Sequence, residues 1–544
     1  MKTLCILVGA ALLLPVESRC DTGADPASDA SAPPSATPFE LPPVPESVAP
    51  SSPDARTFLV RQFVFEGNTA IPEQALQSIA ASYRNRPLRL LDVEALRQAI
   101  TQFYIERGYV NSGAVIPRDG YADGVLRVSI VEGKIAQTRI RGQDRLREDY
   151  VVSRLIRPGE PLNMSVLEER LRLLLTDPLF DRVNARLTPG AELGSAILDV
   201  DIVRARAWRL GLFANNYRAP AVGSTVAGID GALSNLTSWG DVLALAAYRA
   251  GDANNYDLNW SLPLFAKATM LDVHLAHASS SVIEEPLRDL NIESIVETRE
   301  IGITHPVIDR SRTRLVLGVG YSQRVNRTSL DGEPFSFVAG ESSGRVKVED
   351  WRFTQELVQR FDGHVLALRS ALTWGSNNLD AQALIPGQAA RHYRLWIGQA
   401  QTLSTLWDAK ADLVLRATVQ YAWDRLVPLE KLSVGGRFSV RGYRENTLVR
   451  DQGYYATAEL QWPAVGDRRA RRRLELVAPF LDFGRASDRG EPADSLASLG
   501  LGVRGQYEKL EGELFYGLRL MSAPVKTSGD LQDHGIHLQL RYNF

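Results

Sequence analysis

From residue 206 to the C-terminus, apolar and polar residues alternate with a period of two. The clearest segment runs from Leu413 to Asp424, and similar ones lie at residues 315–321 and 514–520. Since successive side chains of a strand point to opposite faces, each segment predicts a β-strand with one apolar face. In the clearest segment the apolar face is Leu413, Leu415, Ala417, Val419, Tyr421 and Trp423, and the opposite face is Val414, Arg416, Thr418, Gln420, Ala422 and Asp424.

This alternation fits a soluble sandwich with its apolar faces inside, and equally a membrane barrel with its apolar faces outside. The C-terminus favours the barrel, since alternate apolar residues from Ile536 to Phe544 end in the aromatic girdle expected at a membrane boundary. At about 21 residues per strand with its loop, residues 207–544 fit sixteen strands. The predicted fold class is therefore a transmembrane antiparallel β-barrel of about 16 strands.

Residues 58–206 predict two copies of a small α+β domain, offset by about 75 residues. The first copy opens at Phe63–Asn68 and the second at Thr138–Gln143. Each reads as a strand ending at a glycine turn, two helices and two strands, with closing strands near 124–132 and 196–203. The predicted boundaries are 58–134 for the first domain and 135–206 for the second.

Helix caps support the helices in both copies. Asp92 is the predicted cap of a helix in the first copy, and Ser165 to Glu168 is a capping-box pattern in the second. The predicted buried faces are Val93, Leu96, Ile100 and Phe103 in the first helix and Leu167, Leu171, Leu174 and Leu175 in the second.

The N-terminus predicts export. Lys2, the apolar run Leu4–Leu14 and a cleavage site at Val16–Ser18 predict a signal peptide over residues 1–18. Residues 19–57 predict an extended linker, because the nine prolines between 21 and 57 disfavour a packed core. The chain has two cysteines, of which Cys5 lies in the signal, so no internal disulfide is expected in the mature protein.

Composition and motifs argue against catalysis and against nucleic acid. The net charge of -2 leaves no basic footprint for nucleic acid, and no phosphate-binding loop is found. Residues 340–344 fit the G-x-S-x-G pattern but lie in a polar loop rather than at a strand-to-helix elbow. The pairs His274/His277 and His534/His537 are three apart, which in a strand separates them onto opposite faces. The expectation is a protein without catalytic residues, cofactor or metal.

Two ordered motifs carry a family resemblance. Val440-Arg441-Gly442-Tyr443 matches the V-R-G-Y element of the outer-membrane assembly and secretion superfamily, and Phe480-Leu481-Asp482-Phe483-Gly484 matches its F-x-D-x-G element. With the two N-terminal repeats, which look like polypeptide-transport-associated (POTRA) domains, the chain from about 58 to 544 resembles the two-partner secretion transporters. These export haemolysins and filamentous adhesins.

The resemblance implies a loop-to-barrel lock. An extracellular loop bearing Val440, Arg441, Gly442 and Tyr443 would fold into the pore, where Arg441 meets Asp482 between Phe480 and Gly484. An arginine fork matches a carboxylate in two hydrogen bonds, and Gly442 would allow a tight turn beside it. The alternative is a solvated loop arginine. The inner face, with charges such as Arg416, Asp424, Glu459 and Arg519, is expected to be wet.

The resemblance also implies partners. A large secreted exoprotein in extended form is expected to add a strand to an open sheet edge of the repeats, although spacers are the alternative. The basic run from Arg468 to Arg473 is either a solvated turn or a contact for outer-membrane lipids. The barrel assembly machinery is expected to read the last strand, which ends in Phe544.

Three points stay open at this stage. The runner-up function is an assembly factor that inserts other barrels or lipids into the outer membrane, and a passive porin is a third alternative. Relatives often carry a helix that plugs the resting pore, but the proline content of residues 21–57 disfavours a regular helix there.

Overall fold

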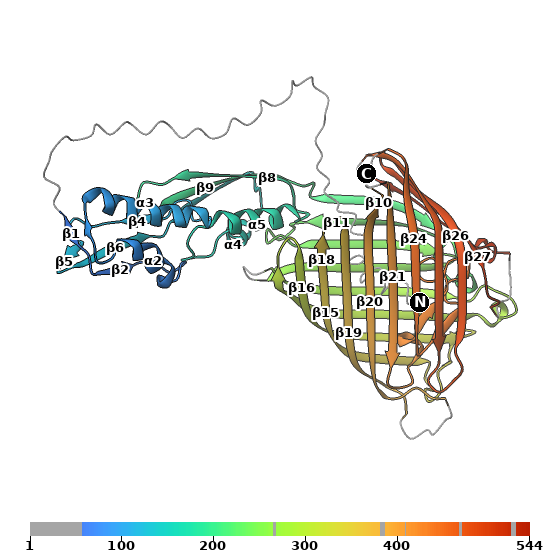
Figure 1. Ribbon diagram of the computed structural model, residues 1–544. Coiled ribbons are helices and arrows are strands. Elements are labelled where there is room, and N and C mark those ends of the chain that lie inside the picture. The colour runs from blue at the N-terminus through green and yellow to red at the C-terminus, as the bar shows by residue number, and fades with distance from the viewer. Residues whose placement is uncertain (1–56, 265–267, 381–386, 408–409, 467–469, 524–528) are drawn as a thin grey trace. The chain divides into compact units, whose positions relative to one another are not determined.

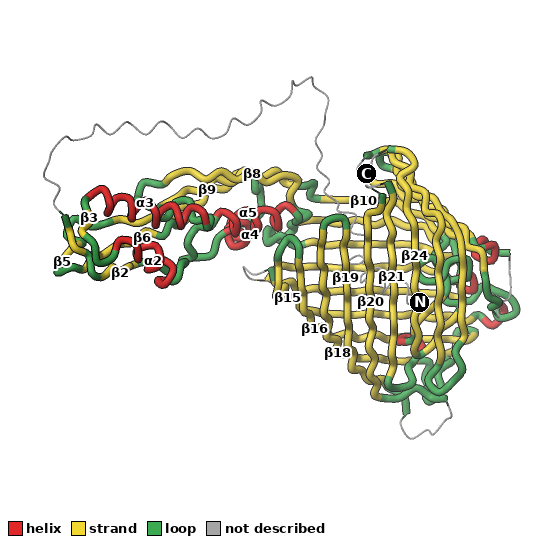
Figure 2. The backbone as a smooth tube through the Cα atoms, in the orientation of Figure 1, coloured by secondary structure: helices red, strands yellow, loops and turns green. Residues whose placement is uncertain are grey.

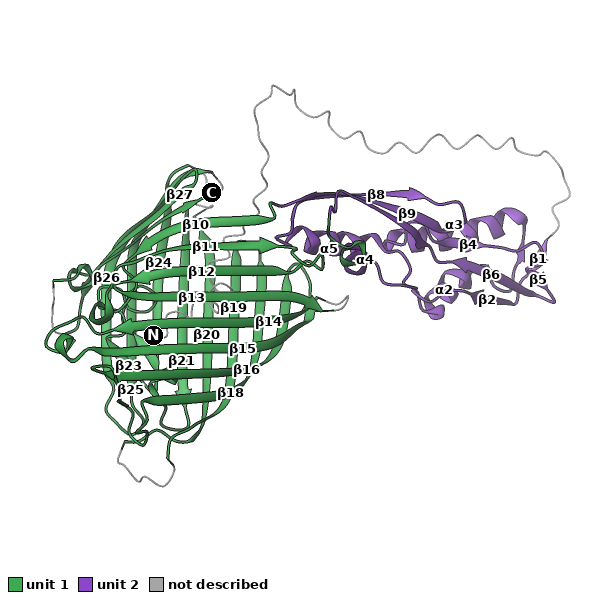
Figure 3. Cartoon of the chain, turned by 180° about the vertical axis from the view of Figure 1, so that it is seen from behind, with its two compact units in different colours: residues 1–19, 145–150, 206–544 green, residues 20–144, 151–205 purple. Residues whose placement is uncertain are grey.

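The computed structural model describes residues 57–264, 268–380, 387–407, 410–466, 470–523 and 529–544. The expected signal peptide at 1–18 and all but the last residue of the expected linker at 19–57 lie outside the described residues. Two compact units are present (Figure 3). Of the described residues, one unit holds those up to 144 and 151–205, and the other holds 145–150 and 206–544.

The first α+β domain follows the predicted order of strand, two helices and two strands. Its sheet has the order β2-β6-β4, with β2 parallel to β6 and β5 also paired to β6. The elements are β1 Phe58–Leu59, β2 Gln62–Glu66, α2 Glu73–Ala80, η1 Ala81–Tyr83, β3 Pro87–Leu88, α3 Leu90–Glu106, β4 Gly113–Val115, β5 Tyr121–Ala122 and β6 Val125–Val131.

The second α+β domain repeats this arrangement. Its sheet has the order β7-β9-β8, again with the first and last strands parallel. Figure 2 shows the helices in red and the strands in yellow. The elements are β7 Lys134–Arg141, α4 Glu148–Leu155, α5 Met164–Leu175, β8 Phe180–Pro189 and β9 Ser195–Arg204. The predicted internal repeat is therefore present in the backbone.

The same glycine requirement occurs in both copies. Gly67 follows β2 with φ +90°, and a Cβ there would lie 2.5 Å from the carbonyl oxygen of Ile130. Gly142 follows β7 with φ +79°, and a Cβ there would lie 2.1 Å from the carbonyl oxygen of Ile202. Because only glycine combines this φ with such a close approach, each first strand must end at a glycine.

Both predicted helix caps are wrong by a few residues. In α3 the N-cap is Arg89, and the Asp92 carboxylate accepts a hydrogen bond from the Arg89 N–H at 2.8 Å. In α5 the N-cap is Asn163, whose Oδ1 accepts from the N–H groups of Ser165 and Val166. The reason is that each helix starts before the residue chosen, so Asp92 and Ser165 already lie in the first turn.

The apolar faces of these helices line the domain cores. Val93, Leu96 and Ile100 are buried as predicted, but Phe103 is only partly buried and the neighbouring Tyr104 is fully buried. The Tyr104 hydroxyl donates a hydrogen bond to Glu132 at 3.1 Å, which gives its polar end a partner. In α5, Leu167 and Leu174 are buried, Leu171 is half-buried and Leu175 is exposed. Fewer of these helix residues are therefore buried in the cores than the sequence pattern predicted.

The remaining residues form a closed barrel of antiparallel strands (Figure 1). The barrel closes where β10 pairs with β28. Sixteen strands make up the wall in the described part of the chain. They are β10 Trp208–Asn215, β11 Val226–Ser234, β12 Val242–Ala250, β13 Ala253–Leu264, β14 Thr269–Ser281, β15 Ile292–Asp309, β16 Thr313–Leu330, β18 Arg345–Phe361, β19 His364–Asn377, β20 His392–Leu406, β21 Ala411–Ala422, β24 Gln452–Val465, β25 Arg472–Ser487, β26 Asp494–Tyr507, β27 Leu510–Arg519 and β28 Ile536–Asn543.

Several short elements lie in the loops of the barrel. Two of them, β22 and β23, form a hairpin with each other and leave the wall. The short elements are η2 Pro220–Val222, η3 Arg288–Leu290, β17 Glu333–Pro334, η4 Pro428–Glu430, β22 Leu432–Val434, β23 Leu448–Arg450 and η5 Leu531–His534. None of the helices among the described residues has the length and apolar character needed to cross a membrane.

The barrel is apolar outside, as predicted. Along β21, Leu415, Val419 and Tyr421 are 41%, 39% and 44% exposed, while Val414 and Gln420 on the other face are buried. The final residues follow the same rule, since Leu540, Tyr542 and Phe544 are exposed on the outer face. This orientation is that of a transmembrane barrel and the reverse of a soluble sandwich.

Candidate functional site

One long loop of the barrel turns its side chains inward. It joins β21 to β24, and it contains η4, the hairpin β22–β23 and the V-R-G-Y residues. Adjacent strands alternate in direction, and β21 is the eleventh strand of the wall. The loop therefore lies at the rim of the barrel opposite to the one where β10 begins.

Arg441 is buried inside the barrel, with 1% of its surface exposed. Its Nε donates to Asp482 Oδ2 at 2.8 Å, its Nη2 donates to Asp482 Oδ1 at 2.7 Å, and its backbone N–H donates to Oδ2 at 3.0 Å. Its Nη1 donates to Glu459 Oε1 at 2.6 Å. The guanidinium thus makes a bidentate pair with one carboxylate and a further bond to a second.

The neighbouring aromatic rings complete this pocket. The guanidinium carbon of Arg441 lies 3.5 Å from the centroid of the Phe480 ring, and Phe480 packs edge-on against Phe515 at 6.1 Å. Both rings are fully buried. A guanidinium over an aromatic face in a buried site gains more than the same contact at a surface.

Gly442 and Tyr443 fix the backbone next to Arg441. Gly442 has φ +89°, and a Cβ there would lie 2.6 Å from the carbonyl oxygen of Gly517 on β27. The Gly442 N–H donates to His537 Nε2 at 3.3 Å, and its carbonyl accepts from Arg519 Nε at 2.6 Å. The Tyr443 hydroxyl donates to the Met521 carbonyl at 2.7 Å. Glycine is required here for two reasons, φ and space.

Val440 and Gly484 make the apolar side of the site. Val440 is fully buried in a cluster with Val434 and Tyr443. A Cβ on Gly484 would lie 2.5 Å from Val434 and 2.9 Å from Val440. The last residue of the F-x-D-x-G element therefore makes room for the loop.

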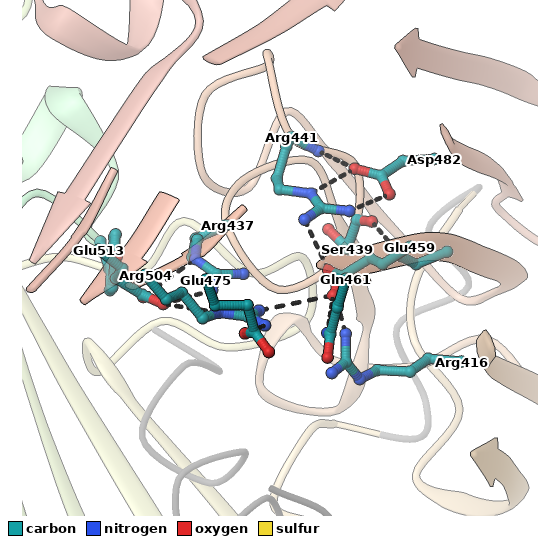
Figure 4. Close-up of polar contacts among 12 residues, drawn as sticks. Arg416, Arg437, Ser439, Arg441, Glu459, Gln461, Glu475, Asp482, Arg504 and Glu513 are labelled. Atoms are coloured by element: carbon teal, nitrogen blue, oxygen red, sulfur yellow. Dashed lines mark hydrogen bonds and ion pairs between the residues drawn. The ribbon is translucent and has the colours of Figure 1, made fainter. Parts of the chain in front are cut away.

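Arg441 belongs to a larger network of eight charged side chains (Figure 4). Glu459 also contacts Arg416 at 3.1 Å and Arg504 at 3.5 Å. Arg504 continues to Glu475 and Glu513, and Glu513 pairs with Arg437 of the loop at 2.8 Å. The members are Arg416, Arg437, Arg441 and Arg504 with Glu459, Glu475, Asp482 and Glu513, so the charges balance.

The expectation of a wet inner face is wrong for part of this wall. Glu459 is fully buried, and Arg416 contacts it. Arg519 donates to the loop backbone at Gly442, and Asp424 accepts from the backbone N–H of Arg394 at 2.9 Å. The loop therefore bonds Arg519, whereas Asp424 lies beyond the end of β21 and bonds to β20.

Several partners of the loop were not predicted from the sequence. Arg437 and Arg444 flank the motif, and Arg444 pairs with Asp533 at 2.5 Å and with Glu284 at 2.8 Å. In the sequence, Glu459 and Glu513 could be recognised only as acidic residues on the strand face that points into the barrel. Alternation gives the facing of such residues, but it cannot pair residues from strands far apart in sequence.

One residue set aside at the sequence level does have a role, since His537 accepts a hydrogen bond from Gly442 of the loop. Its predicted neighbour His534 lies in η5 rather than in a strand, so the strand-spacing argument does not apply to that pair. Ser342 lies in the loop before β18, a strand, so no nucleophile elbow forms. His274 is buried against Asp257 and Glu300, and His277 lies on the other face of β14. Of the basic run, Arg472 pairs with Glu508 at 2.6 Å, and Arg468 and Arg469 lie outside the described residues. Within the described ranges no cluster of His, Cys, Asp and Glu could hold a metal ion.

The fold and the inward loop define a class of protein, a bacterial outer-membrane β-barrel preceded by periplasmic α+β domains. Residues 194–505, more than half of the chain, match the family of haemolysin secretion/activation proteins ShlB/FhaC/HecB. The chain belongs to this family. Residues 58–133 match the ShlB-type POTRA domain. The protein resides in the outer membrane, with its POTRA domains in the periplasm.

Known proteins agree with this assignment. The chain is 25% identical over 471 residues to the outer membrane transporter CdiB of Escherichia coli, covering 80% of this chain and 75% of that one. It is 24% identical over 438 residues to the hemolysin transporter protein ShlB of Serratia marcescens, covering 75% and 73%. The solved structure of CdiB from Escherichia coli has the same fold, with a TM-score of 0.71 at 22% identity over 92% and 93% of the two chains.

Proposed function

We propose that this protein is the outer-membrane translocation pore of a two-partner secretion system, which recognises and exports one large exoprotein of the haemolysin or adhesin type. The observation that carries the proposal is the loop of a ShlB/FhaC/HecB family barrel buried in the interior through Arg441 and Asp482. A wall that holds charged side chains suits the passage of an extended polypeptide, whose backbone needs polar surroundings. The transport involves no catalysis by this chain.

The loop-to-barrel lock comprises Val440, Arg441, Gly442, Tyr443, Phe480, Asp482 and Gly484. Its role is to hold the loop at one register inside the pore until the client arrives. Support comes from the bidentate pair and the two glycines that leave no space for a side chain, Gly442 and Gly484. A balanced and bonded buried network favours a single arrangement of the loop.

The periplasmic domains, 58–134 and 135–206, capture the client as an extended chain. Their sheets end at open edges, and an edge strand offers unpaired backbone groups to another strand. Residues 1–18 serve as the signal peptide and 19–57 as a linker. The outer surface contacts outer-membrane lipids, and the barrel assembly machinery reads the last strand with Phe544.

Deleting the gene tests the function itself. We expect one very large protein to disappear from the culture medium, while the set of other outer-membrane barrels stays unchanged by mass spectrometry. If many barrels are instead lost from the membrane, the protein is an assembly factor. If neither set changes, the pore serves small solutes.

The lock is tested by Arg441→Ala and Arg441→Lys in the same strain. We expect both to lower export at least tenfold with normal amounts of folded barrel, because lysine keeps the charge but cannot make the bidentate pair. Arg288→Ala, at an exposed arginine in another loop at the same rim, is the matched control. Export at the wild-type level in Arg441→Ala would exclude the lock.

A further inference from the structure

The same loop has a second attachment to the barrel wall, at its foot. Glu430, the last residue of η4, is 6% exposed and forms an ion pair with Arg324 of β16. Arg324 Nη2 also donates to Asp350 Oδ2 of β18 at 2.8 Å, and Arg352 lies 3.4 Å from Oδ1 of the same carboxylate. None of these residues belongs to the network around Arg441.

Both ends of the loop are packed and hydrogen-bonded at this foot. We call the segment that follows β21 the outgoing leg and the segment that precedes β24 the returning leg. Leu426 and Val427 are buried in an apolar cluster with residues of β18 and β20, among them Val348 and Leu395. Gln420 Nε2, on the wall, donates to the carbonyl of Glu430 at 3.0 Å and to that of Asp451 at 2.9 Å. One wall side chain thus holds the outgoing and the returning legs together.

A second carboxylate fixes the returning leg. Asp451 is 1% exposed and accepts from the backbone N–H groups of Leu426 and Arg489 at 3.1 and 2.9 Å. Lys431 Nζ lies 3.3 Å from the same carboxylate. These bonds between the legs involve none of the eight charged side chains around Arg441.

The two attachments have opposite polarity. At the tip, the loop supplies the cations Arg437 and Arg441 to wall carboxylates. At the foot, the loop supplies the carboxylate of Glu430 to a wall that carries Arg324 and Arg352. Sliding or reversing the loop would bring like charges together in a buried site, which is strongly unfavourable. The ion pairs of Glu430 and Arg441 thus favour the observed direction of the loop, while Lys431 at the foot is a cation that pairs with Asp488.

We infer that Glu430, Arg324 and Asp350 form a foot anchor that stays closed when Arg441 leaves Asp482, so that the loop swings about this anchor rather than leaving the barrel as a whole. The moving part is then the hairpin and the tip, from Leu432 to Arg450. Glu430 is a positioning residue in this account. The inference takes from the proposed function only that the loop moves during transport.

The test measures loop exposure rather than export, so it separates this inference from the proposed function. Cys5 and Cys20 are replaced by serine, and one reporter cysteine is placed at Val427 in the foot or at Val440 in the tip. Both valines are fully buried, and cysteine is close to valine in size. Intact cells are treated with a membrane-impermeant maleimide, and the rate of labelling is measured.

Arg441→Ala should raise labelling of the tip reporter at least tenfold and leave the foot reporter protected. Glu430→Gln should raise labelling of the foot reporter at least tenfold, Glu430→Asp should restore part of the protection, and Glu333→Gln, at an exposed glutamate of the same rim, should change nothing. A difference in gel migration between heated and unheated samples verifies a folded barrel in every variant.

Two results would overturn the inference. If Arg441→Ala exposes both reporters equally, the loop leaves as one body and the foot is no anchor. If Glu430→Gln leaves the foot reporter as protected as Glu333→Gln does, the ion pair has no positioning role, whether or not the chain exports a client.

Discussion

Apolar and charged side chains are buried in opposite ways in the periplasmic domains and in the barrel. Leu96 in α3 is fully buried, whereas Leu501 in β26 is 53% exposed on the outside of the barrel. Conversely, Arg441 and Asp482 are buried in the barrel, while the charged side chains of α3 lie on its surface. Water surrounds one region, and lipid surrounds the other.

The difference teaches what each region needs for stability. A domain in water gains free energy by removing apolar area from solvent. A barrel in lipid has no such gain on its outer face, so its interior contacts and backbone pairing carry the specificity. The balanced network around Arg441 is one such interior contact, and a charge there must be bonded because it is buried.

Leu96→Ala should have the largest effect on stability. It removes a fully buried side chain and leaves a cavity, at a cost of about 2–5 kcal/mol in the free energy of unfolding of the first domain. Urea-dependent proteolysis of the full chain in membranes measures this. Leu501→Ala is the control, since lipid fills the space, and equal losses in both variants would contradict the comparison.

Leu501→Arg should come next. A charge on the lipid face at the middle of a strand costs about 2–4 kcal/mol, whereas one near the membrane boundary costs about 0–1 kcal/mol. Leu510→Arg, at the first residue of β27 and 45% exposed, provides the boundary control. The measurement is the urea midpoint of barrel folding into lipid vesicles. Similar midpoints for the two variants would mean that this face does not cross the membrane.

Alternation, turns and short motifs allowed much of the fold to be predicted. The period of two gave the outward face of β21, and the glycines at 67 and 142 marked the ends of two equivalent strands. Both results follow from backbone geometry, which repeats every two residues or requires one residue type. Such local rules act within a few residues and can be seen in sequence.

Partners distant in sequence could not be predicted. The motifs pointed to Arg441 and Asp482, but Glu459, Arg504 and Glu513 meet them through the pairing register of β24 to β27 and the inward fold of the loop. Glu430 is an ordinary polar residue in the sequence and an ion-pair partner in the fold. The predicted cap of α5 was also wrong. Asn163 and Ser165 are both good N-cap residues, and the start of α5 decides between them.

Asn163→Ala should have a moderate effect within the periplasmic domains. It removes the cap of α5 and the bond from Asn163 Nδ2 to the Arg107 carbonyl at the end of α3, which lies 2.8 Å away. Loss of an N-cap costs about 0.5–2 kcal/mol. Ser165→Ala should have almost no effect, and the same proteolysis assay compares the two. A larger loss in Ser165→Ala would restore the capping box predicted from the sequence.

Glu94→Gln should have the smallest effect, and it should depend on pH. The hydrogen bond and charge of Arg97 hold the pKa of Glu94 below its usual 4.5, so the folded domain favours the ionised carboxyl. The stabilisation is present above that pH and is lost as the pH falls through the lowered pKa. Because both side chains are partly exposed, at 47% and 35%, it amounts to below about 0.5 kcal/mol. Urea midpoints of the first domain should therefore differ slightly between wild type and Glu94→Gln at pH 7, and the difference should shrink as the pH falls below 4.5, whereas a constant difference would assign the effect to packing.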